Sequence, residues 1–347
     1  MGMCGSCGSY TPARPRVLVV KLGAGGDVVR TTCLLRRLRT EHPEAHITWV
    51  IDPDNAELLA NNPLLDRVLP MSGSLSVLCA IEHFDTAFGL DHDPFGAALV
   101  TLCRAETKRG FLLSSEGKPV PADNHAAYWY QLGLSDALKF RENRKTYQEY
   151  MFEACGYVFR KETSLVQLTD AERHAVHGLW DSLSLPEHTV GINLGGSPRF
   201  AGRHWPDTHV LDLARDLTTR GVGVLLLAGP AERERAERLA AQSRGIAVLP
   251  TVTKRELAAV VERLTALVSS DTLALHLAVA MGTRAVALFG GTSWFEFEPY
   301  GLAEVLTAKL PCSPCYRSDC TDQQCMVSIT PRRVLDALVQ ASGEVPR

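Results

Sequence analysis

The sequence contains no long hydrophobic run. Hydrophobic residues make up 46% of the 347 positions, but nowhere do they approach the roughly 18 consecutive residues that a membrane-spanning helix requires. The segment at residues 1–16, MGMCGSCGSYTPARPR, also lacks the apolar core of a signal peptide. These two absences argue against a membrane protein and against a secreted one, and we expect a cytoplasmic protein.

Charge of either sign is not in excess, and short repeats are absent. The formal net charge of −3 gives no support for nucleic-acid binding, so no nucleic-acid partner is expected. No internal repeat or low-complexity segment interrupts the chain. Its length exceeds the roughly 250–300 residues at which a single hydrophobic core stops growing, which favours two domains.

Cysteine, by contrast, is plentiful. Four of the ten cysteines lie in apolar helical stretches, where we expect buried small hydrophobic residues: Cys33, Cys79, Cys103 and Cys155. The others form two clusters, Cys4/Cys7 and Cys312/Cys315/Cys320/Cys325. The second cluster reads C-x2-C-x4-C-x4-C, and four thiolates so close in sequence could surround one tetrahedral zinc or iron ion. Free thiols and a disulfide pair are the alternatives.

The chain is organised around its first predicted strand and the turn that follows. An apolar stretch at 17–22, interrupted only by Lys21, predicts a buried parallel strand, and GAGG at 23–26 ends it. Apolar residues then recur at helical spacing from Val28 to Leu38. A strand, a glycine turn and a helix in this order place Asp27 at the functional edge of a βα unit. We expect its carboxylate to cap free backbone N–H groups and to face a cleft.

Strands and helices alternate along the rest of the chain. Apolar segments predict strands at 47–51, 66–71, 84–90 and 109–113, and the pattern restarts near 162–170 with strands at 189–195 and 222–229. Such alternation is typical of parallel sheets with helices on both faces, so we predict an α/β fold with two doubly wound domains. The predicted division is a flexible segment at 1–15, domains at 16–165 and 166–330, a Cys-rich loop at 311–326, and a C-terminal helix and tail at 331–347.

Small residues follow most of the predicted strands. They allow backbone N–H groups to approach a phosphate, and the next helix N-terminus favours its negative charge. Most of these turns lie in the second half, so a nucleotide is expected there: 195–197, 229–230, 269–272 and 290–292. The first turn does not fit a dinucleotide fingerprint, because Val28 replaces its third glycine and Asp27 would repel the pyrophosphate.

The most informative segment is SSDTLALHLAVAMG at 269–282. Asp271 and Thr272 start a predicted helix, and His276 lies one turn later on the same face. A helix-capping aspartate and a packed histidine would give the same pattern. Upstream, RHWPD places Arg203 just before a helix start, where its guanidinium could grip a diphosphate with two hydrogen bonds. A surface salt bridge is the alternative for this arginine.

Several blocks, taken together, resemble glycosyltransferase family 9, the lipopolysaccharide heptosyltransferases and their relatives. They are KLGAGGDVVRTTCLLRRLRTEHPEAHITWV, GINLGGS, GRHWP, LLLAGPAERERAERLA, LVSSDTLALHLAVAMGTRAVALFGGT and PCSPCY…C…CM. The resemblance covers roughly residues 16–340, in the family's order and spacing. It implies a GT-B fold, in which two Rossmann-like domains with parallel sheets face a central cleft. The first domain would hold the acceptor and the second the nucleotide sugar.

The resemblance also implies a reaction. By this resemblance the chain would transfer heptose from ADP-heptose with inversion of the anomeric configuration. Catalysis would require no cofactor. Asp27 matches the general base, in a loop with Gly25 and Gly26 that faces the acceptor. The residues that match the nucleotide-sugar site are Gly195, Ser197, Arg203, Glu232, Asp271, Thr272 and His276. These residue types suit the chemistry, since a departing diphosphate needs cationic and N–H donors and the attacking hydroxyl needs a carboxylate.

Two departures from the family leave the substrates open. The family usually has glycine where this chain has Leu273, and a bulkier residue before the glycine-aspartate pair of the base loop. The acceptor is expected to be a glycan that resembles the lipopolysaccharide core, or a protein, and a peripheral contact with the inner membrane surface stays open. The alternatives are a family member that uses another nucleotide sugar, and a non-catalytic metal-binding assembly protein.

Overall fold

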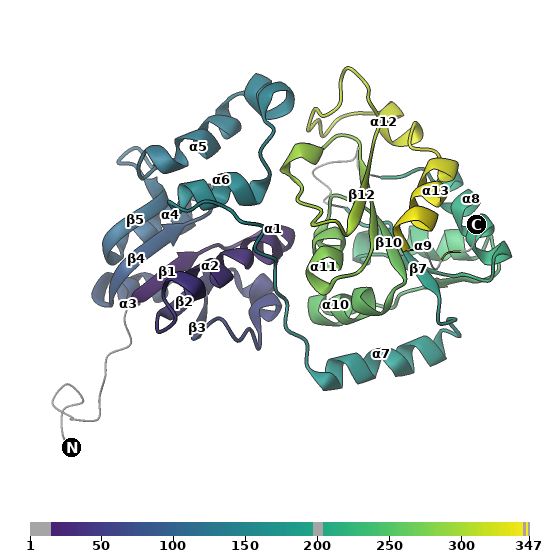
Figure 1. Cartoon of the computed structure of the whole chain (residues 1–347), viewed down its shortest axis with the longest axis horizontal. Coiled ribbons are helices and arrows are strands. Elements are labelled where there is room, and N and C mark those ends of the chain that lie inside the picture. Colours follow the sequence, from purple (N-terminus) through teal and green to yellow (C-terminus); the bar gives the residue numbers. More distant parts are fainter. Residues whose placement is uncertain (1–14, 197–203, 343–344, 346–347) are drawn as a thin grey trace.

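A computed structural model describes residues 15–196, 204–342 and 345. It contains two six-stranded sheets, one from each half of the chain, with helices on both faces of each (Figure 1). The expected α/β fold with two sheet domains is therefore confirmed, although the exact boundaries stay predictions. Four residues singled out from the sequence, Cys4, Cys7, Ser197 and Arg203, lie outside the described residues.

The first sheet has the strand order β3-β2-β1-β4-β5-β6. Its strands are β1 (Arg16–Val20), β2 (His46–Ile51), β3 (Arg67–Pro70), β4 (His83–Gly89), β5 (Arg104–Leu113) and β6 (Pro119–Pro121). All neighbours pair in parallel except β5 and β6, which are antiparallel. The order reverses between β1 and β4, and a doubly wound sheet binds ligands at such a switch point, beyond the carboxyl ends of its strands.

Helical segments cover both faces of this sheet. They are α1 (Gly25–Thr31), α2 (Cys33–Glu41), the 3₁₀ segment η2 (Pro53–Leu59), α3 (Leu75–Ile81), α4 (Pro94–Leu102), the 3₁₀ turn η3 (Asn124–Ala126), α5 (Ala127–Leu134), the π-helical turn η4 (Leu138–Glu142) and α6 (Tyr147–Ala154). A long helix, α7 (Asp170–Ser182), then leads to the second half along the lower edge of Figure 1.

The second sheet repeats the same topology, with the order β12-β11-β10-β7-β8-β9. Its strands are β7 (Thr189–Asn193), β8 (Gly223–Leu227), β9 (Ile246–Val248), β10 (Ala266–Ser270), β11 (Ala285–Phe289) and β12 (Ala303–Thr307). Every pairing is parallel. The switch point falls between β7 and β10, so the small-residue turns at 195–196 and 271–272 lie at neighbouring strand ends.

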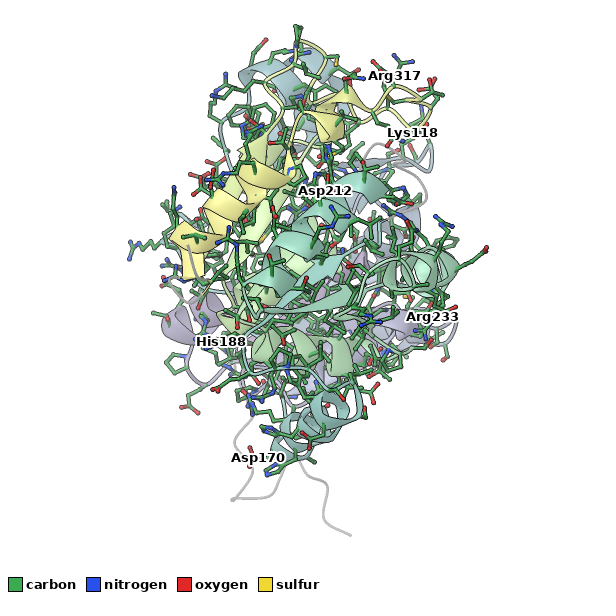
Figure 2. The ribbon with its side chains drawn as sticks, turned by 90° about the vertical axis from the view of Figure 1, so that its right-hand side faces the viewer. Lys118, Asp170, His188, Asp212, Arg233 and Arg317 are labelled. Carbon is green, nitrogen blue, oxygen red and sulfur yellow. The ribbon has the colours of Figure 1, made fainter. Side chains whose placement is uncertain are left out.

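The remaining helical segments belong to this half. They are α8 (Asp207–Thr219), η6 (Pro230–Glu232), α9 (Arg233–Ala240), α10 (Lys254–Arg263), α11 (Leu273–Met281), η7 (Trp294–Glu296), α12 (Gln324–Val327) and α13 (Pro331–Ser342). Charged side chains such as Asp212 of α8 and Arg233 of α9 cover the outer face (Figure 2). The Cys-rich loop, marked by Arg317, and the start of α7, marked by Asp170, lie at opposite ends of the molecule in that view.

The first predicted helix differs from the structure in one respect. The apolar spacing from Val28 to Leu38 indicates a continuous helix, but the structure divides it at Thr32 into α1 and α2. The Thr32 hydroxyl donates to the Val29 carbonyl over 2.6 Å and accepts from the Leu165 N–H over 2.8 Å. A threonine hydroxyl that bonds to the preceding turn competes with the helical hydrogen bonds. The apolar spacing gave no sign of this break.

The two domains share one hydrophobic core at their interface. A single cluster of buried residues runs from α1 and α2 of the first domain to α10 and α11 of the second. The outer faces are closed by separate clusters, which include α3 and α4 in the first domain and α8 and α13 in the second. The interface therefore brings the N-terminal ends of α1 and α11 together, beside the switch points of both sheets (Figure 1).

Candidate active site

An interdomain cavity of about 910 Å³ opens where the carboxyl ends of the two sheets face each other. Its lining includes every described residue predicted for the acceptor loop, the base and the nucleotide-sugar site: Gly25, Gly26, Asp27, Gly195, Glu232, Asp271, Thr272 and His276. The sequence places these residues far apart along the chain. They meet in one cavity only because the carboxyl ends of the two sheets face each other.

The backbone of Gly26 approaches the imidazole of His276 closely, and this contact sets how α1 and α11 lie against each other in the cavity wall. A Cβ atom on Gly26 would lie 2.6 Å from Cδ2 of His276, so residue 26 must be glycine for α1 and α11 to meet in this way. His276 is buried, with 7% exposure, and its Nε2 lies 3.5 Å from Oδ1 of Asp271. The loop that contains Gly26 and Asp27 therefore lies against the 269–276 segment.

Asp27 lies in the first turn of α1 but does not cap it. The N-cap position is Ala24, with no side-chain cap, so the expected capping by Asp27 is wrong. Its Oδ1 instead accepts from both Nε and Nη2 of Arg30, at 3.0 and 2.7 Å. Burial acts to raise the pKa of Asp27, but Arg30, then Lys21 and His276, outweigh it and lower the pKa below its usual value. The carboxylate is therefore ionised, with 34% of its side chain exposed to the cavity.

Lys21 is the polar interruption of the first strand, and it is buried beside Asp27. Its ammonium group binds the Asp91 carboxylate and the Gly23 carbonyl and lies 3.9 Å from Oδ2 of Asp27. Burial acts to lower the pKa of Lys21, but Asp91, Tyr147 and Asp27 raise it above the ordinary value. The ammonium is thus held charged beside the Asp27 carboxylate. The sequence signal was present, since a lysine inside a buried strand requires a partner.

Arg30 and Glu296 are site residues that the sequence analysis did not select. Arg30 contacts Asp27 in the first domain, and its Nη1 donates to the Glu296 backbone carbonyl in the second, over 3.3 Å. The Glu296 carboxylate accepts from the hydroxyls of Tyr150, at 3.2 Å, and Tyr316, at 2.8 Å. All four residues line the cavity. No short motif marks them, because the contacts join four segments that are distant in sequence.

On the side of the second domain, Asn193 ties the ends of β7 and β10 together. Its Nδ2 lies within hydrogen-bond distance of the Gly195 carbonyl (3.1 Å), Ser269 Oγ (3.1 Å) and Thr272 Oγ1 (3.0 Å). This amide holds the turn after β7 against the start of α11. Thr272 is the N-cap residue of α11 and has no side-chain cap bond, so the first N–H groups of the helix face the cavity beside it.

Glu232 lies close to two glycine turns. Cβ atoms added to Gly229 and Gly195 would lie 3.1 and 3.7 Å from its Oε2, which brings the turns after β7 and β8 together. Arg235 holds the chain on both sides of the segment at 197–203, because it donates to the Leu194 carbonyl at 3.4 Å and the Trp205 carbonyl at 2.7 Å. The predicted roles of Ser197 and Arg203 are not tested by the described residues.

Aromatic and basic side chains line the other side of the cavity. The indole of Trp129 packs between the rings of Tyr147 and His92, with centroids at 5.5 and 5.4 Å. Desolvation in the cavity, with Lys21 and Lys139 nearby, lowers the pKa of His92 to about 4, so its ring is neutral at physiological pH. This wall comes from the loop after β4, from α5, from η4 and from α6, and no sequence motif marks it.

The cysteines divide as expected between core and loop. Cys33, Cys79, Cys103 and Cys155 are buried among apolar side chains and are free thiols. The four cysteines of the Cys-rich loop are also free, and their exposure ranges from the exposed Cys312 to the buried Cys325. Across the described part of the chain, no three His, Cys, Asp or Glu side chains converge as metal ligands. As arranged here, the four thiols do not fit a metal centre.

With this geometry established, the chain was compared with known proteins. The family described as "Glycosyltransferase family 9 (heptosyltransferase)" matches residues 82–326. Lipopolysaccharide heptosyltransferase 1 of Pseudomonas aeruginosa is 30% identical over 328 residues, which cover 89% of this chain and 88% of that protein. The chain belongs to glycosyltransferase family 9. It is accordingly a glycosyltransferase.

Solved structures agree with the family in fold. A family 9 glycosyltransferase from Veillonella parvula has a TM-score of 0.77 at 18% identity, and the match covers 96% of this chain and 99% of that one. Escherichia coli heptosyltransferase WaaC with ADP-2-deoxy-2-fluoro heptose has a TM-score of 0.64 at 19% identity, over 94% and 99% of the chains. At such identities the likeness concerns the fold alone, and it confirms the GT-B arrangement of the two domains.

A third similar structure is that of an iron-containing enzyme. The iron-containing dodecameric heptosyltransferase TibC, from enterotoxigenic E. coli, has a TM-score of 0.56 at 14% identity, covering 96% of this chain and 78% of that one. This likeness too is one of fold. Separately, none of the helices in the described residues is both long enough and apolar enough to cross a bilayer.

Proposed function

We propose that this chain transfers heptose, with inversion, from ADP-heptose to a sugar hydroxyl of a glycan that resembles the lipopolysaccharide core. One observation carries the proposal. An ionised carboxylate, Asp27, faces the N-terminus of α11 and the turns after β7 and β8 across a single cavity. A base on one side and N–H donors on the other are what a glycosyl transfer with a diphosphate leaving group requires.

The reaction follows from this arrangement. The acceptor hydroxyl gives its proton to Asp27 as its oxygen attacks the anomeric carbon of the donor. A new carbon–oxygen bond forms, and the bond to the β-phosphate breaks on the opposite face, which inverts the configuration. The electron pair leaves with ADP, whose growing negative charge is stabilised by the N-terminus of α11 and, by resemblance, by Arg203. No metal ion or cofactor takes part in these steps.

The donor assignment draws on the relatives. The similar proteins named above are heptosyltransferases, and one of the similar structures holds an ADP-heptose analogue. In this chain Glu232 lies at the turn after β8, where its carboxylate could accept hydrogen bonds from ribose hydroxyls. Leu273, in the place where the family usually has glycine, lines the cavity next to Thr272 and would restrict the space around the transferred sugar.

The acceptor assignment draws on the first domain's wall. Trp129 and the neutral ring of His92 offer apolar faces for the C–H surface of a sugar ring. Lys139 adds a positive charge at the same wall, which would attract an acidic or phosphorylated sugar. A folded protein acceptor would have to reach this wall with an extended segment, so we favour the glycan.

The experiment has two arms. Thermal stabilisation by ADP, UDP and GDP tests the nucleotide, and we expect ADP to stabilise the chain most. Transfer from ADP-heptose to a heptose-deficient lipopolysaccharide core is then measured for wild type and D27N, with D212N on the outer face as the control. We expect D27N to lose about 10²–10⁴-fold in kcat while it binds ADP like wild type. Preference for UDP, or equal activity in D27N, would overturn the proposal.

We keep a structural zinc or iron at Cys312, Cys315, Cys320 and Cys325 as a separate proposal. Its support is chemical: four thiols within fourteen residues, and an iron-containing heptosyltransferase of similar fold. The arrangement of the described side chains does not support it, and catalysis does not depend on it. The cytoplasmic location and the peripheral contact with the inner membrane surface stay predictions.

A further inference from the structure

Arg30 holds the proposed base by one oxygen only. It lies one turn after Asp27 on α1, with 16% of its side chain exposed, and both of its hydrogen bonds to the carboxylate end on Oδ1. Among the described residues, the nearest cation to the other oxygen, Oδ2, is Lys21, at 3.9 Å, which is too far for a direct hydrogen bond. Within this part of the chain, Oδ2 is thus the oxygen that is left to accept a proton from the acceptor.

Arg30 is itself fixed from two further directions. Its guanidinium carbon lies 3.7 Å from the centre of the Tyr147 ring of α6, within the range of a cation–π contact. Its Nη1 donates to the Glu296 carbonyl of the second domain. Three contacts on three different elements leave the side chain a single arrangement. An ordinary surface pair at i, i+3 has no such constraint.

The contact with Glu296 connects the base to the second domain. Glu296 is buried, and its carboxylate is held by the hydroxyls of Tyr150 and Tyr316. The carbonyl that receives Arg30 is therefore fixed in place. Because Asp27 and Arg30 belong to the first domain and Glu296 to the second, the alignment of the carboxylate depends on contact between the domains.

We propose that Arg30 is a positioning residue for the transfer reaction: it turns Oδ2 of Asp27 toward the acceptor, and it does so fully only when the second domain supplies the Glu296 carbonyl. This inference rests on the proposed role of Asp27 as the base. It assigns to Arg30 a function in the alignment of the base, in addition to any contribution to stability.

The pH dependence of transfer separates a role of Arg30 in the alignment of the base from a role in stability alone. The ionisable groups around Asp27 come from all the elements packed against it: Lys21 after β1, Arg30 of α1, Asp91 after β4, Tyr147 and Tyr150 of α6, and Asp271 and His276 at α11. Burial raises the pKa of Asp27 and Arg30 is the main group that lowers it. Removal of the arginine charge should therefore raise the pKa of the base.

The test compares R30M and R30K with wild type, and R36M serves as the matched control because Arg36 donates to the Thr163 carbonyl on an exposed surface. We expect kcat to fall at least tenfold in R30M, and the acid limb of kcat/KM for the acceptor to move up by about one pH unit. The kcat and the acid limb of R30K should lie between those of wild type and R30M. The ADP affinity should change less than threefold in either variant. An unmoved acid limb in an active R30M would overturn the inference.

A second measurement does not require activity. The cost of D27N in unfolding free energy is measured from pH 2 to pH 8, in the wild-type and the R30M backgrounds. With Arg30 present the cost should rise as the pH increases toward the unfolded pKa of Asp, about 3.9, and stay constant above it, because the folded pKa is lowered. Without Arg30 this rise should vanish or reverse. Equal profiles in both backgrounds would overturn the inference. If the profiles differ but wild type transfers no sugar, the proposed function fails, and Arg30 then has no reaction to serve.

Discussion

Gly26 of α1 and His276 of α11 meet across the domain interface with no room for a side chain at residue 26. This contact brings the loop with Asp27 to the second domain, in which we propose that the nucleotide binds. It also makes the cavity sensitive to small changes far from any reacting atom, because a shift of one helix displaces Asp27 relative to the donor.

The first prediction concerns this contact. G26A should destabilise the protein by about 1–3 kcal/mol and lower kcat at least tenfold, since the new Cβ must displace a buried imidazole. Urea unfolding and a transfer assay measure the two effects. Gly178 of α7 has no atom within 4 Å of an added Cβ, so G178A should instead stabilise by roughly 0.5–1 kcal/mol. A G26A variant with full activity would show that the helices can separate freely.

The second prediction concerns the buried ion pair of Lys21 and Asp91, which lies beside Asp27. K21M leaves Asp91 buried without its cation, and we expect a loss of about 3–5 kcal/mol. The double variant K21M/D91N removes both charges, so it should regain a large part of that stability but no activity. Chemical unfolding and transfer assays distinguish the two. If the double variant were less stable than K21M, the pairing of these groups would not be the reason for the loss.

The charge state of Lys21 gives this pair a definite pH behaviour. Its pKa is raised in the folded state, so its contribution is fully present below the unfolded value of about 10.4 and is lost only as the pH rises through the higher folded pKa. The difference in unfolding free energy between wild type and K21M should therefore stay constant from pH 6 to pH 9. A decline within that range would contradict a charged lysine.

The third prediction concerns Arg255, which joins segments of both domains. It donates to the carbonyls of Glu57 (3.2 Å), Ala60 (3.1 Å) and Gln167 (2.8 Å) and binds the Glu172 carboxylate of α7. R255M should cost roughly 2–4 kcal/mol, because several carbonyls and a carboxylate lose a buried donor. R215M, which removes only an exposed pair with Asp212, should change stability by less than about 0.5 kcal/mol.

Acid titration provides a separate check on Arg255. Its hydrogen bond is the main reason that the pKa of Glu172 is lowered to about 2. A lowered carboxyl pKa contributes stability above the unfolded value of about 4.3, and this contribution is lost as the pH falls toward 2. Wild-type stability should thus fall more steeply than that of R255M between pH 4.3 and pH 2. Parallel profiles would show that the pair is not coupled.

The fourth prediction concerns metal at the Cys-rich loop. If the four cysteines bind a metal ion, as predicted from their spacing, elemental analysis of the purified chain finds about one zinc or iron per chain. The C315S variant should then lose the metal, while the neighbouring S318A variant should keep it. A structural metal should be removable by a chelator with transfer activity retained. Equal metal content in C315S and S318A, or none in wild type, would instead agree with the separate thiols of the structure.

Much of the fold could be predicted from local sequence. Apolar strands that alternate with helical spacing specify parallel sheets, and the predicted strand at 47–51 lies within β2. The strand predicted at 109–113 begins earlier, at Arg104, because the polar residues at the start of β5 hide its period. The break of the first helix at Thr32 was equally hidden, since it depends on the distant Leu165 N–H. The spacing of apolar residues predicts helices and strands, but it does not predict the contacts between them.

The sequence by itself determined the family and the fold class, and it predicted the segments that line the cavity: the GAGGD turn and the 269–276 segment. Tertiary structure alone decided that Asp27 pairs with Arg30 rather than capping its helix, that the Glu296 carbonyl completes this arrangement, and that Trp129 and His92 form the opposite wall. The reason is physical. Local patterns report the backbone that a segment adopts, whereas the charge and orientation of a buried carboxylate depend on groups that only the packing of two domains brings within a few ångströms.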